Sequence, residues 1–171
     1  MKRHVILVGL PGVGKSTVGM LSAEELGAPF VDLDAVITRR GQMPVARIFA
    51  ELGEGRFREL ETEAMTSVLE GEPSIISPGG GWIAQPGNFE AARPTSFFVW
   101  LTCMVNTAAN RAEEGERRPL LSVQPLDAMR RLLSERERYY KQADAEIRNE
   151  SRAPRETAKE VVAVLRERAG W

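Results

Sequence analysis

A nine-residue glycine-rich stretch near the start of the chain constrains its fold more than any other feature. Residues 9–17 read GLPGVGKST, which fits the G-x-x-x-x-G-K-[ST] pattern of loops that wrap nucleotide phosphates. The apolar run His4–Val8 precedes this stretch, and Val18–Leu26 after it has the spacing of an amphipathic helix. Strand, glycine loop and helix therefore follow one another in the order that a phosphate-binding loop requires. The sequence predicts that a nucleoside triphosphate binds here.

Each residue type in this loop suits one task at the phosphates. Glycines let backbone N–H groups turn inward around an anion, and the N-terminus of the following helix adds partial positive charge. Lys15 can reach the β- and γ-phosphate oxygens, and the Ser16 hydroxyl can ligate Mg²⁺. We therefore expect nucleotide contacts from Gly12, Val13, Gly14, Lys15, Ser16 and Thr17.

Size and charge exclude several classes of protein. A chain of 171 residues predicts one domain spanning residues 1–171. The 23 basic and 24 acidic residues nearly cancel, so neither nucleic acid nor an anionic membrane is expected as a partner. No apolar run approaches the roughly 18 residues of a membrane span, and we expect a cytoplasmic monomer. With one cysteine, a thiolate metal site is excluded, and the single histidine, His4, is expected at the surface.

Short β-type runs alternate with segments of helical periodicity, which predicts an α/β fold with a parallel sheet covered by helices. The run Ser96–Leu101 is continuously apolar after its first residue, as in a strand buried on both faces. Helices are expected to begin near Lys15, Ala35, Val45, Arg56, Val105, Pro125 and Pro154. The other strands are expected at His4–Val8, Pro29–Leu33, Ser74–Ser77 and Ala145–Arg148.

Two regions exceed a minimal nucleotide-binding core. The mostly helical stretch at 34–70 stands between the second and third strands, and its first part, about 34–61, could grip a second substrate. The polar segment at about 112–124 contains Gly115 and Pro119 and is expected to be a lid. Small kinases use such an insertion and lid to exclude water from the phosphoryl group.

Two carboxylates, Asp32 and Asp34, stand at the end of the second expected strand. If the strand continues through them, both project to one face, toward the phosphate site at the carboxyl end of the sheet. Asp32 could hold Mg²⁺ through a bound water, and Asp34 could accept the proton of an attacking hydroxyl. The alternative is that Asp34 only caps the next helix.

Arginines and glycines farther along the chain suggest a pocket for a small anion. Arg58 and Glu61 share a helix face; such pairs are usually solvated, but Phe49 and Phe57 nearby favour a partly dry pocket in which a guanidinium grips a carboxylate. The triplet at 79–81 directly follows the third strand and permits close approach of a ligand, although a bare turn is as consistent with it.

Further arginines could neutralise the transferring phosphoryl group or reach the pocket. Arg111, Arg117 and Arg118 frame the expected lid, where a guanidinium could act as an arginine finger. Either Arg136 or Arg138, on a later helix, could reach the site.

Together these residues resemble the shikimate kinase family over nearly the whole chain. The matching blocks are GLPGVGKST at 9–17, DLD at 32–34, IFAELGEGRFRELE at 48–61, GGG at 79–81, RAEEGERRPLL at 111–121 and RERYYKQAD at 136–144. The resemblance implies a nucleoside-monophosphate-kinase-like fold with a five-stranded parallel sheet in the order 2-3-1-4-5. It also implies Mg²⁺-dependent transfer from ATP to the 3-hydroxyl of shikimate, a step of aromatic amino acid (chorismate) biosynthesis.

The resemblance also implies roles for individual residues. At the acceptor, Asp34 would bind the substrate hydroxyls and act as or near the base, Arg58 and Arg136 would hold the carboxylate, and Gly80 and Gly81 would close around the ring. Arg118 would be the lid arginine that bridges both substrates. At the nucleotide, the phosphates and the metal would be served by Lys15, Ser16 and Thr17, with Asp32 as a further Mg²⁺ partner, and the adenine by Arg111, Arg152 and Pro154.

Two departures from the family pattern leave other acceptors open. Trp82 follows the glycine triplet and could reshape the pocket or pack beneath it, and Thr38-Arg39-Arg40 replaces the usual residues after the paired aspartates. A kinase of another small hydroxy acid, such as gluconate, is the alternative enzyme. A nucleotide-dependent binding module that has lost catalysis is the alternative of a different class.

Overall fold

One parallel five-stranded sheet organises the molecule. The computed structural model describes residues 1–114, 125–150 and 153–171. The sheet order is β2-β3-β1-β4-β5, and every pair is parallel. The order is the one that the resemblance implies, so the predicted fold class is confirmed. The strands are β1 (His4–Val8), β2 (Phe30–Asp32), β3 (Ile75–Ser77), β4 (Ser96–Thr102) and β5 (Ala145–Arg148).

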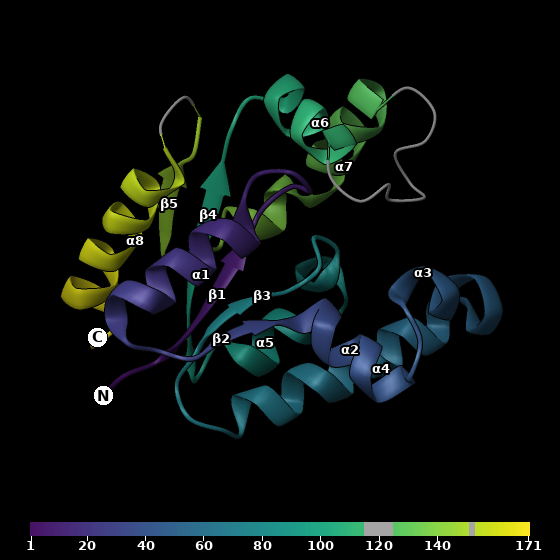
Figure 1. Cartoon of the computed structure of the whole chain (residues 1–171), viewed down its shortest axis with the longest axis horizontal. Helices are drawn as coiled ribbons and strands as arrows, with labels where there is room; N and C mark the ends of the chain where they lie inside the picture. Colours follow the sequence, from purple (N-terminus) through teal and green to yellow (C-terminus); the bar gives the residue numbers. More distant parts are fainter. Residues whose placement is uncertain (115–124, 151–152) are drawn as a thin grey trace.

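Helices cover both faces of this sheet (Figure 1). One face packs against α1 and α8, and the other packs against α2, α4, α5, α6 and α7. The helices are α1 (Lys15–Leu26), α2 (Leu33–Gly41), α3 (Val45–Arg47), α4 (Gly53–Leu69), α5 (Asn88–Ala92), α6 (Val105–Glu114), α7 (Pro125–Tyr140) and α8 (Pro154–Arg168), with a π-helical turn η1 (Ile48–Leu52) and a 3₁₀ turn η2 (Trp82–Ala84).

The central strand β1 shows why two helical layers are needed. Its side chains alternate between faces, so Val5 and Leu7 join the core under α1 and α8 while Ile6 and Val8 join the opposite core. All four are at most 2% exposed. Burying an aliphatic side chain of this size contributes roughly 1.5–3 kcal/mol, so covering both faces stabilises the strand that carries the phosphate loop.

The expected helical insertion between the second and third strands is present as α2, α3, η1 and α4. Its α2 and α4 pack on one face of the sheet, and the insertion extends beyond the end of the strands, away from α1 and α8 (Figure 1). The expected lid falls largely outside the described residues. Among the helices that the structure describes, none is long and apolar enough to cross a membrane.

Two local expectations were wrong, and two short elements were not expected. His4 is not at the surface: it is 4% exposed and lies against Ser74, with its Nδ1 3.2 Å from the Ser74 hydroxyl, because β4 and β3 flank β1. The second strand ends at Asp32 rather than at residue 33, since Asp32 caps α2. The elements η2 and α5 were not expected, because segments this short show no periodicity.

Candidate functional site

Three connections meet at the carboxyl edge of the sheet. The phosphate loop at 9–17 follows β1, Asp34 lies just beyond β2, and the glycine triplet at 79–81 follows β3. Because β1 and β2 both pair with β3, these segments are neighbours in space. Ligands of open parallel sheets bind at this edge, so the sequence motifs gather where a site is expected.

The phosphate loop has the backbone shape that its glycines permit. Gly12 and Gly14 have φ of 78° and 103°, a region that other residues rarely adopt, and α1 begins directly after them at Lys15. The Lys15 side chain is buried, and its Nζ donates to the carbonyls of Gly9 and Leu10, 2.9 Å each. The loop therefore presents a helix N-terminus and an ammonium group on one side, which suits phosphate oxygens.

Side-chain oxygens that could act as metal ligands lie beside this loop. The Ser16 hydroxyl lies 3.2 Å from the Ser77 hydroxyl, and Ser77 pairs in the sheet with Asp32. A hydroxyl and a carboxylate are hard oxygen ligands, and Mg²⁺ keeps several waters and phosphate oxygens beside one or two such groups. The residues that the sequence assigned to the metal, Ser16 and Asp32, therefore fit Mg²⁺.

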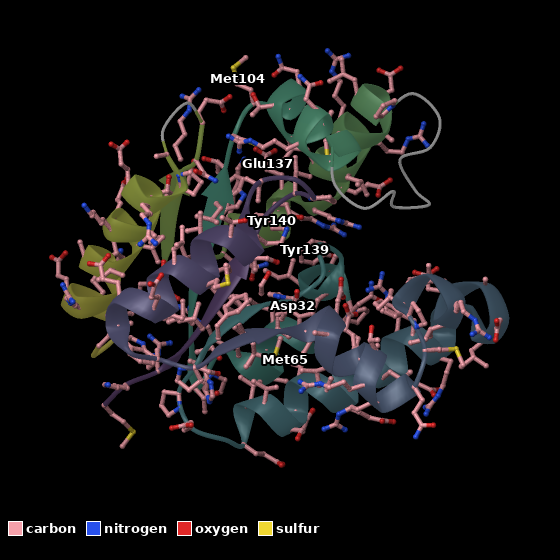
Figure 2. The ribbon with its side chains drawn as sticks, in the orientation of Figure 1. Asp32, Met65, Met104, Glu137, Tyr139 and Tyr140 are labelled. Atoms are coloured by element: carbon pink, nitrogen blue, oxygen red, sulfur yellow. The ribbon has the colours of Figure 1, made fainter. Side chains whose placement is uncertain are left out.

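Asp32 caps the helix that carries Asp34. The Asp32 carboxylate accepts from the backbone N–H groups of Asp34 and Ala35, at 3.0 and 3.4 Å. Figure 2 shows Asp32 where β2 gives way to α2. The expectation that a continuing strand aligns the two carboxylates was wrong, because the capping interaction starts α2 at Leu33. The alternative role of helix cap falls to Asp32, not to Asp34.

Asp34 nevertheless faces the glycine triplet. A β-carbon added at Gly79 would lie 3.6 Å from the Asp34 Oδ1 and 3.3 Å from the Glu61 Oε1. Two carboxylates from α2 and α4 therefore line one side of the triplet. A hydroxylated ligand there would meet hydrogen-bond acceptors.

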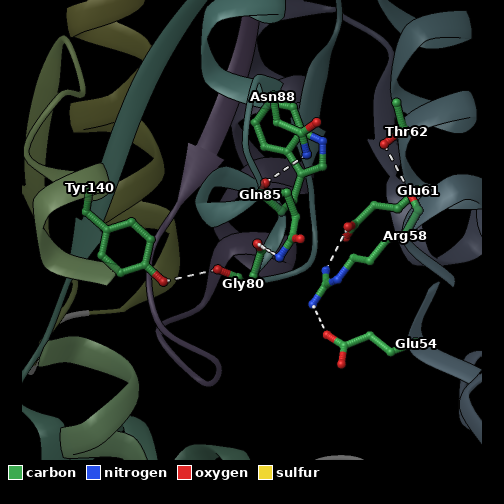
Figure 3. A network of polar contacts seen from close by, with 10 residues as sticks. Glu54, Arg58, Glu61, Thr62, Gly80, Gln85, Asn88 and Tyr140 are labelled. Atoms are coloured by element: carbon green, nitrogen blue, oxygen red, sulfur yellow. Dashed lines mark hydrogen bonds and ion pairs between the residues drawn. The ribbon is translucent and has the colours of Figure 1, made fainter. Parts of the chain in front are cut away.

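Arg58 and Glu61 form a partly buried pair rather than the usual solvated one: the Glu61 side chain is buried and the Arg58 side chain is partly exposed. The Arg58 Nη1 donates to the Glu61 Oε2 at 2.7 Å, and Glu61 is 1% exposed (Figure 3). Burial raises the pKa of Glu61, although Arg58 opposes the shift. The guanidinium carbon of Arg58 also lies 5.1 Å from the ring centre of Phe57, which stacks on Phe49 at 4.4 Å. The pocket wall is thus partly dry, as the aromatic neighbours predicted.

The Arg58–Glu61 pair still has polar atoms that could form hydrogen bonds with a ligand. Within the described residues, the buried Arg58 Nε and Glu61 Oε1 have no hydrogen-bond partner. Buried polar atoms without a partner are uncommon and costly in folded proteins. The outer Arg58 Nη2 makes a long contact to the exposed Glu54, at 3.5 Å. This end of Arg58 is well placed to exchange Glu54 for an anionic ligand.

Arg136 approaches the glycine triplet, whereas Arg138 lines the cleft without reaching the triplet. A β-carbon added at Gly81 would lie 3.1 Å from the Arg136 Nη2 and 3.0 Å from the Arg58 Nη2, so two guanidinium groups converge there. At Gly80 it would lie 3.0 Å from the Arg136 Nη1 and 3.5 Å from the Gly9 carbonyl. Arg138 is exposed and donates to the hydroxyl of its neighbour Tyr139. Of the two arginines that the sequence left as candidates for the substrate site, the structure favours Arg136.

Tyr140 fixes the glycine triplet from the side of α7. Its hydroxyl donates to the Gly80 carbonyl at 3.2 Å, opposite the Arg58 side of the network (Figure 3). Burial raises the pKa of the Tyr140 phenol, so it remains a donor at neutral pH. Sequence reasoning did not assign this residue to the site, and its only signal is the YY pair inside a block already linked to Arg136.

A cleft of about 480 Å³ opens beside the two converging arginines. Its walls come from α4, η2 and α7, and they include Gln85, Leu132 and Tyr139. Trp82 is not part of this lining: it is 1% exposed and belongs to the core beneath the triplet. Of the two roles considered for Trp82, the structure favours packing. The Arg39 and Arg40 side chains are exposed at the end of α2.

The remaining nucleotide residues are only partly described. The Arg111 guanidinium donates to the carbonyls of Asn149 and Glu150, at 3.0 and 2.7 Å, in the segment between β5 and α8. Arg118 and Arg152, like Arg117, lie outside the described residues. The expected adenine site is therefore represented by Arg111 and by Pro154, which starts α8.

Comparison with known proteins gives a consistent result. The family model described as shikimate kinase matches residues 11–166. A shikimate kinase of Symbiobacterium thermophilum is 40% identical over 96% of this chain and 97% of its own. A shikimate kinase structure from Acinetobacter baumannii in complex with shikimate has a TM-score of 0.92 at 31% identity, covering 98% of this chain and 94% of that one. A gluconokinase structure from Sinorhizobium meliloti 1021 has a TM-score of 0.67 at 18% identity, covering 99% and 94%, which shows a shared fold alone.

Proposed function

This chain belongs to the shikimate kinase family, and we propose that it transfers the γ-phosphoryl group of ATP to the 3-hydroxyl of shikimate. The products are shikimate 3-phosphate and ADP. The observation that carries the proposal is the convergence of the Arg58 and Arg136 guanidinium groups at Gly81, beside the phosphate loop. Phosphoryl transfer needs mainly positioning and charge neutralisation, and this arrangement supplies both.

The acceptor end of the site matches the chemistry of shikimate. Shikimate is a small acid with one carboxylate and vicinal hydroxyls. A guanidinium binds a carboxylate through two parallel hydrogen bonds, so Arg58 and Arg136 hold the acid end. Asp34, at the Gly79 end of the glycine triplet, accepts from the hydroxyls and takes the proton of the attacking one. Gly80 and Gly81 leave room for the ring between these groups.

The nucleotide end belongs to the phosphate loop. Backbone N–H groups of Gly12, Gly14 and Thr17 hold phosphate oxygens. The Val13 N–H and the Lys15 ammonium exchange their contacts with loop carbonyls for the phosphates, Lys15 at the transferred phosphoryl group. Ser16 and Asp32 would hold Mg²⁺, which neutralises charge on the phosphates. Arg111 and Arg152 serve the adenine, and Arg118 serves the phosphoryl group from the lid.

Gluconate remains the second candidate acceptor, since it also carries one carboxylate and several hydroxyls. The buried position of Trp82 weakens the reason for preferring it, because the indole does not narrow the cleft. We further propose that the enzyme acts as a monomer in the cytoplasm, where ATP is available.

The direct test measures ADP release by purified protein with ATP and Mg²⁺, with shikimate, with gluconate and without an acceptor. We expect shikimate alone to raise the rate above background, and ³¹P NMR to detect a phosphate ester at the 3-position. Stimulation by gluconate alone would support the alternative acceptor. ADP binding without transfer to either acid would support a module that has lost catalysis.

Asp34→Asn separates chemistry from binding in the same assay. A general base contributes about 10²–10⁴-fold, so transfer to shikimate should fall by at least about 100-fold while the dissociation constant of ADP stays unchanged. A comparable loss of ADP affinity would assign Asp34 to the nucleotide instead.

A further inference from the structure

A buried amide outside the catalytic motifs braces the phosphate loop. Asn149 follows β5 directly and is 4% exposed. Its Nδ2 donates to the Val13 carbonyl at 2.8 Å, and its backbone N–H donates to the Thr102 carbonyl at the end of β4 at 2.7 Å. The side chain therefore joins two segments 136 positions apart in the sequence, from a backbone that the sheet itself anchors.

Thr157 sets which end of this amide meets the loop. The Thr157 hydroxyl, fully buried on α8, donates to the Asn149 Oδ1 at 2.8 Å. An amide has one end that only accepts and one that only donates. With the accepting end used by Thr157, the donating end faces Val13. The orientation of Asn149 is thus fixed by a second buried side chain.

Because of the geometry of the Val13–Gly14 peptide, the hydrogen bond from Asn149 to the Val13 carbonyl also affects the direction of the Gly14 N–H. In a planar trans peptide, the carbonyl oxygen and the following N–H point in opposite directions. We propose that Asn149 is a positioning residue: by holding the Val13 carbonyl, it turns the Gly14 N–H away from itself and toward the phosphates of the bound nucleotide. This inference rests on the ATP-dependent function proposed above.

The packing at Gly14 agrees with this role. A β-carbon added there would lie 2.5 Å from the Asn149 Nδ2, so the amide approaches the loop as closely as a glycine permits. Gly14 also has φ of 103°, which a residue with a side chain would hold only under strain. The amide and the glycine together define one conformation of the loop.

The same segment is tied to α6. Arg111 donates to the Asn149 and Glu150 carbonyls, and the Glu150 carboxylate accepts from the Met104 N–H at 2.6 Å and from the Thr107 hydroxyl. None of these groups is among the residues assigned to the acceptor. A fault at Asn149 should therefore weaken nucleotide binding and leave the acceptor pocket intact.

Asn149→Asp tests the proposal with almost no change in shape. The aspartate keeps an acceptor for Thr157 but sets a carboxylate oxygen against the Val13 carbonyl, where the amide had donated. Calorimetry should show the dissociation constant of ADP raised about tenfold or more, the size expected for a buried hydrogen bond replaced by a repulsive contact. The dissociation constant of shikimate should change less than about twofold.

Two further variants keep the test decisive if Asn149→Asp fails to fold. Thr157→Val removes only the hydroxyl that orients the amide, and should raise the ADP dissociation constant by about threefold. Ser74→Ala, the matched control, removes a buried hydroxyl at the opposite end of β3, beside His4, and should leave ADP binding unchanged.

Unchanged ADP affinity in Asn149→Asp or, if that variant does not fold, in Thr157→Val would overturn the proposal. So would an equal loss of ADP and shikimate affinity, or a loss of ADP affinity in Ser74→Ala. Failure of the wild-type protein to bind ADP would instead overturn the proposed function, so the two failures are distinguishable.

Discussion

At the scale of single residues, the acceptor pocket depends on the burial of the Glu61 carboxylate and its pairing with Arg58. Glu61 is buried and keeps one oxygen without a partner among the described residues, while its other oxygen fixes Arg58. A buried carboxylate is tolerated when a cation pairs with it, and that pairing also prevents the guanidinium from swinging into solvent. The result is an arginine already oriented toward the glycine triplet before a ligand arrives.

Exchange of Arg136 for lysine tests the second guanidinium. Lysine keeps the charge but loses the fork that binds both carboxylate oxygens. Hydrogen bonds to charged groups contribute about 1.5–3 kcal/mol, so kcat/KM for shikimate should fall roughly 10–100-fold in Arg136→Lys. Steady-state rates at saturating ATP measure this loss.

Arg138→Lys is the comparison variant: this side chain also lines the cleft, but it is exposed, bonds to Tyr139 and does not reach the glycine triplet. Its kcat/KM should remain close to that of the wild type. An equal fall of kcat/KM in both variants, or a fall in Arg138→Lys alone, would contradict the assignment of the shikimate carboxylate to Arg136.

At the scale of elements, the start of the sheet contains a titratable group away from the site. Burial lowers the pKa of His4, partly opposed by a hydrogen bond to the Leu69 backbone. The Ser74 N–H donates to the His4 Nδ1 at 3.3 Å, a bond that requires that nitrogen to be unprotonated. The neutral imidazole therefore helps to hold β1 and β3 together.

The stability of the fold should reflect this histidine as pH falls. At pH values between the lowered pKa of His4 in the folded protein and about 6.5, its value in the unfolded chain, the unfolded chain binds more protons at this residue. The contribution of His4 to the free energy of unfolding is therefore complete above about pH 6.5 and is lost as the pH falls. Urea unfolding at about pH 7 and about pH 5.5 should show a smaller loss of stability in His4→Gln than in the wild type. The pKa of Glu61 is raised rather than lowered, so its effect on the pH dependence of stability has the opposite sign. Because Glu61 is present in both proteins, this effect cancels in the comparison. Because His4 is the only histidine in the chain, no other imidazole contributes to this difference. Equal losses of stability in the two proteins would contradict a role of neutral His4 in holding β1 and β3 together.

Elements were predictable where their signal is local and continuous. The strand expected over Ser96–Leu101, which extends one residue further in the structure, and the helices that begin at Pro125 and Pro154 were predicted because an apolar run and an N-terminal proline are evident from neighbouring residues. The end of β2 was not, because the competing use of Asp32 as a helix cap depends on where the chain turns. The inward position of His4 was missed because it depends on the order of strands rather than on the residue's neighbours in sequence.

At the scale of the whole molecule, the site is assembled from segments that are far apart in the chain. Asp34, Arg58 and Arg136 approach one glycine triplet because β2 and β3 are adjacent and α7 packs against η2. The motifs and the family resemblance predicted these residues, and Glu61 was recognised only as the partner of Arg58. The Asn149–Val13 contact could not be predicted, because nothing in an isolated asparagine indicates a partner 136 residues away.

The most direct measurement is the crystal structure of the protein with shikimate, ADP and Mg²⁺ bound. We predict the carboxylate of shikimate at about 2.7–2.9 Å from guanidinium nitrogens of both Arg58 and Arg136, with a ring hydroxyl at the Asp34 carboxylate and facing the phosphate loop. Shikimate bound with its carboxylate away from both arginines, or with its hydroxyls turned from Asp34, would contradict the account.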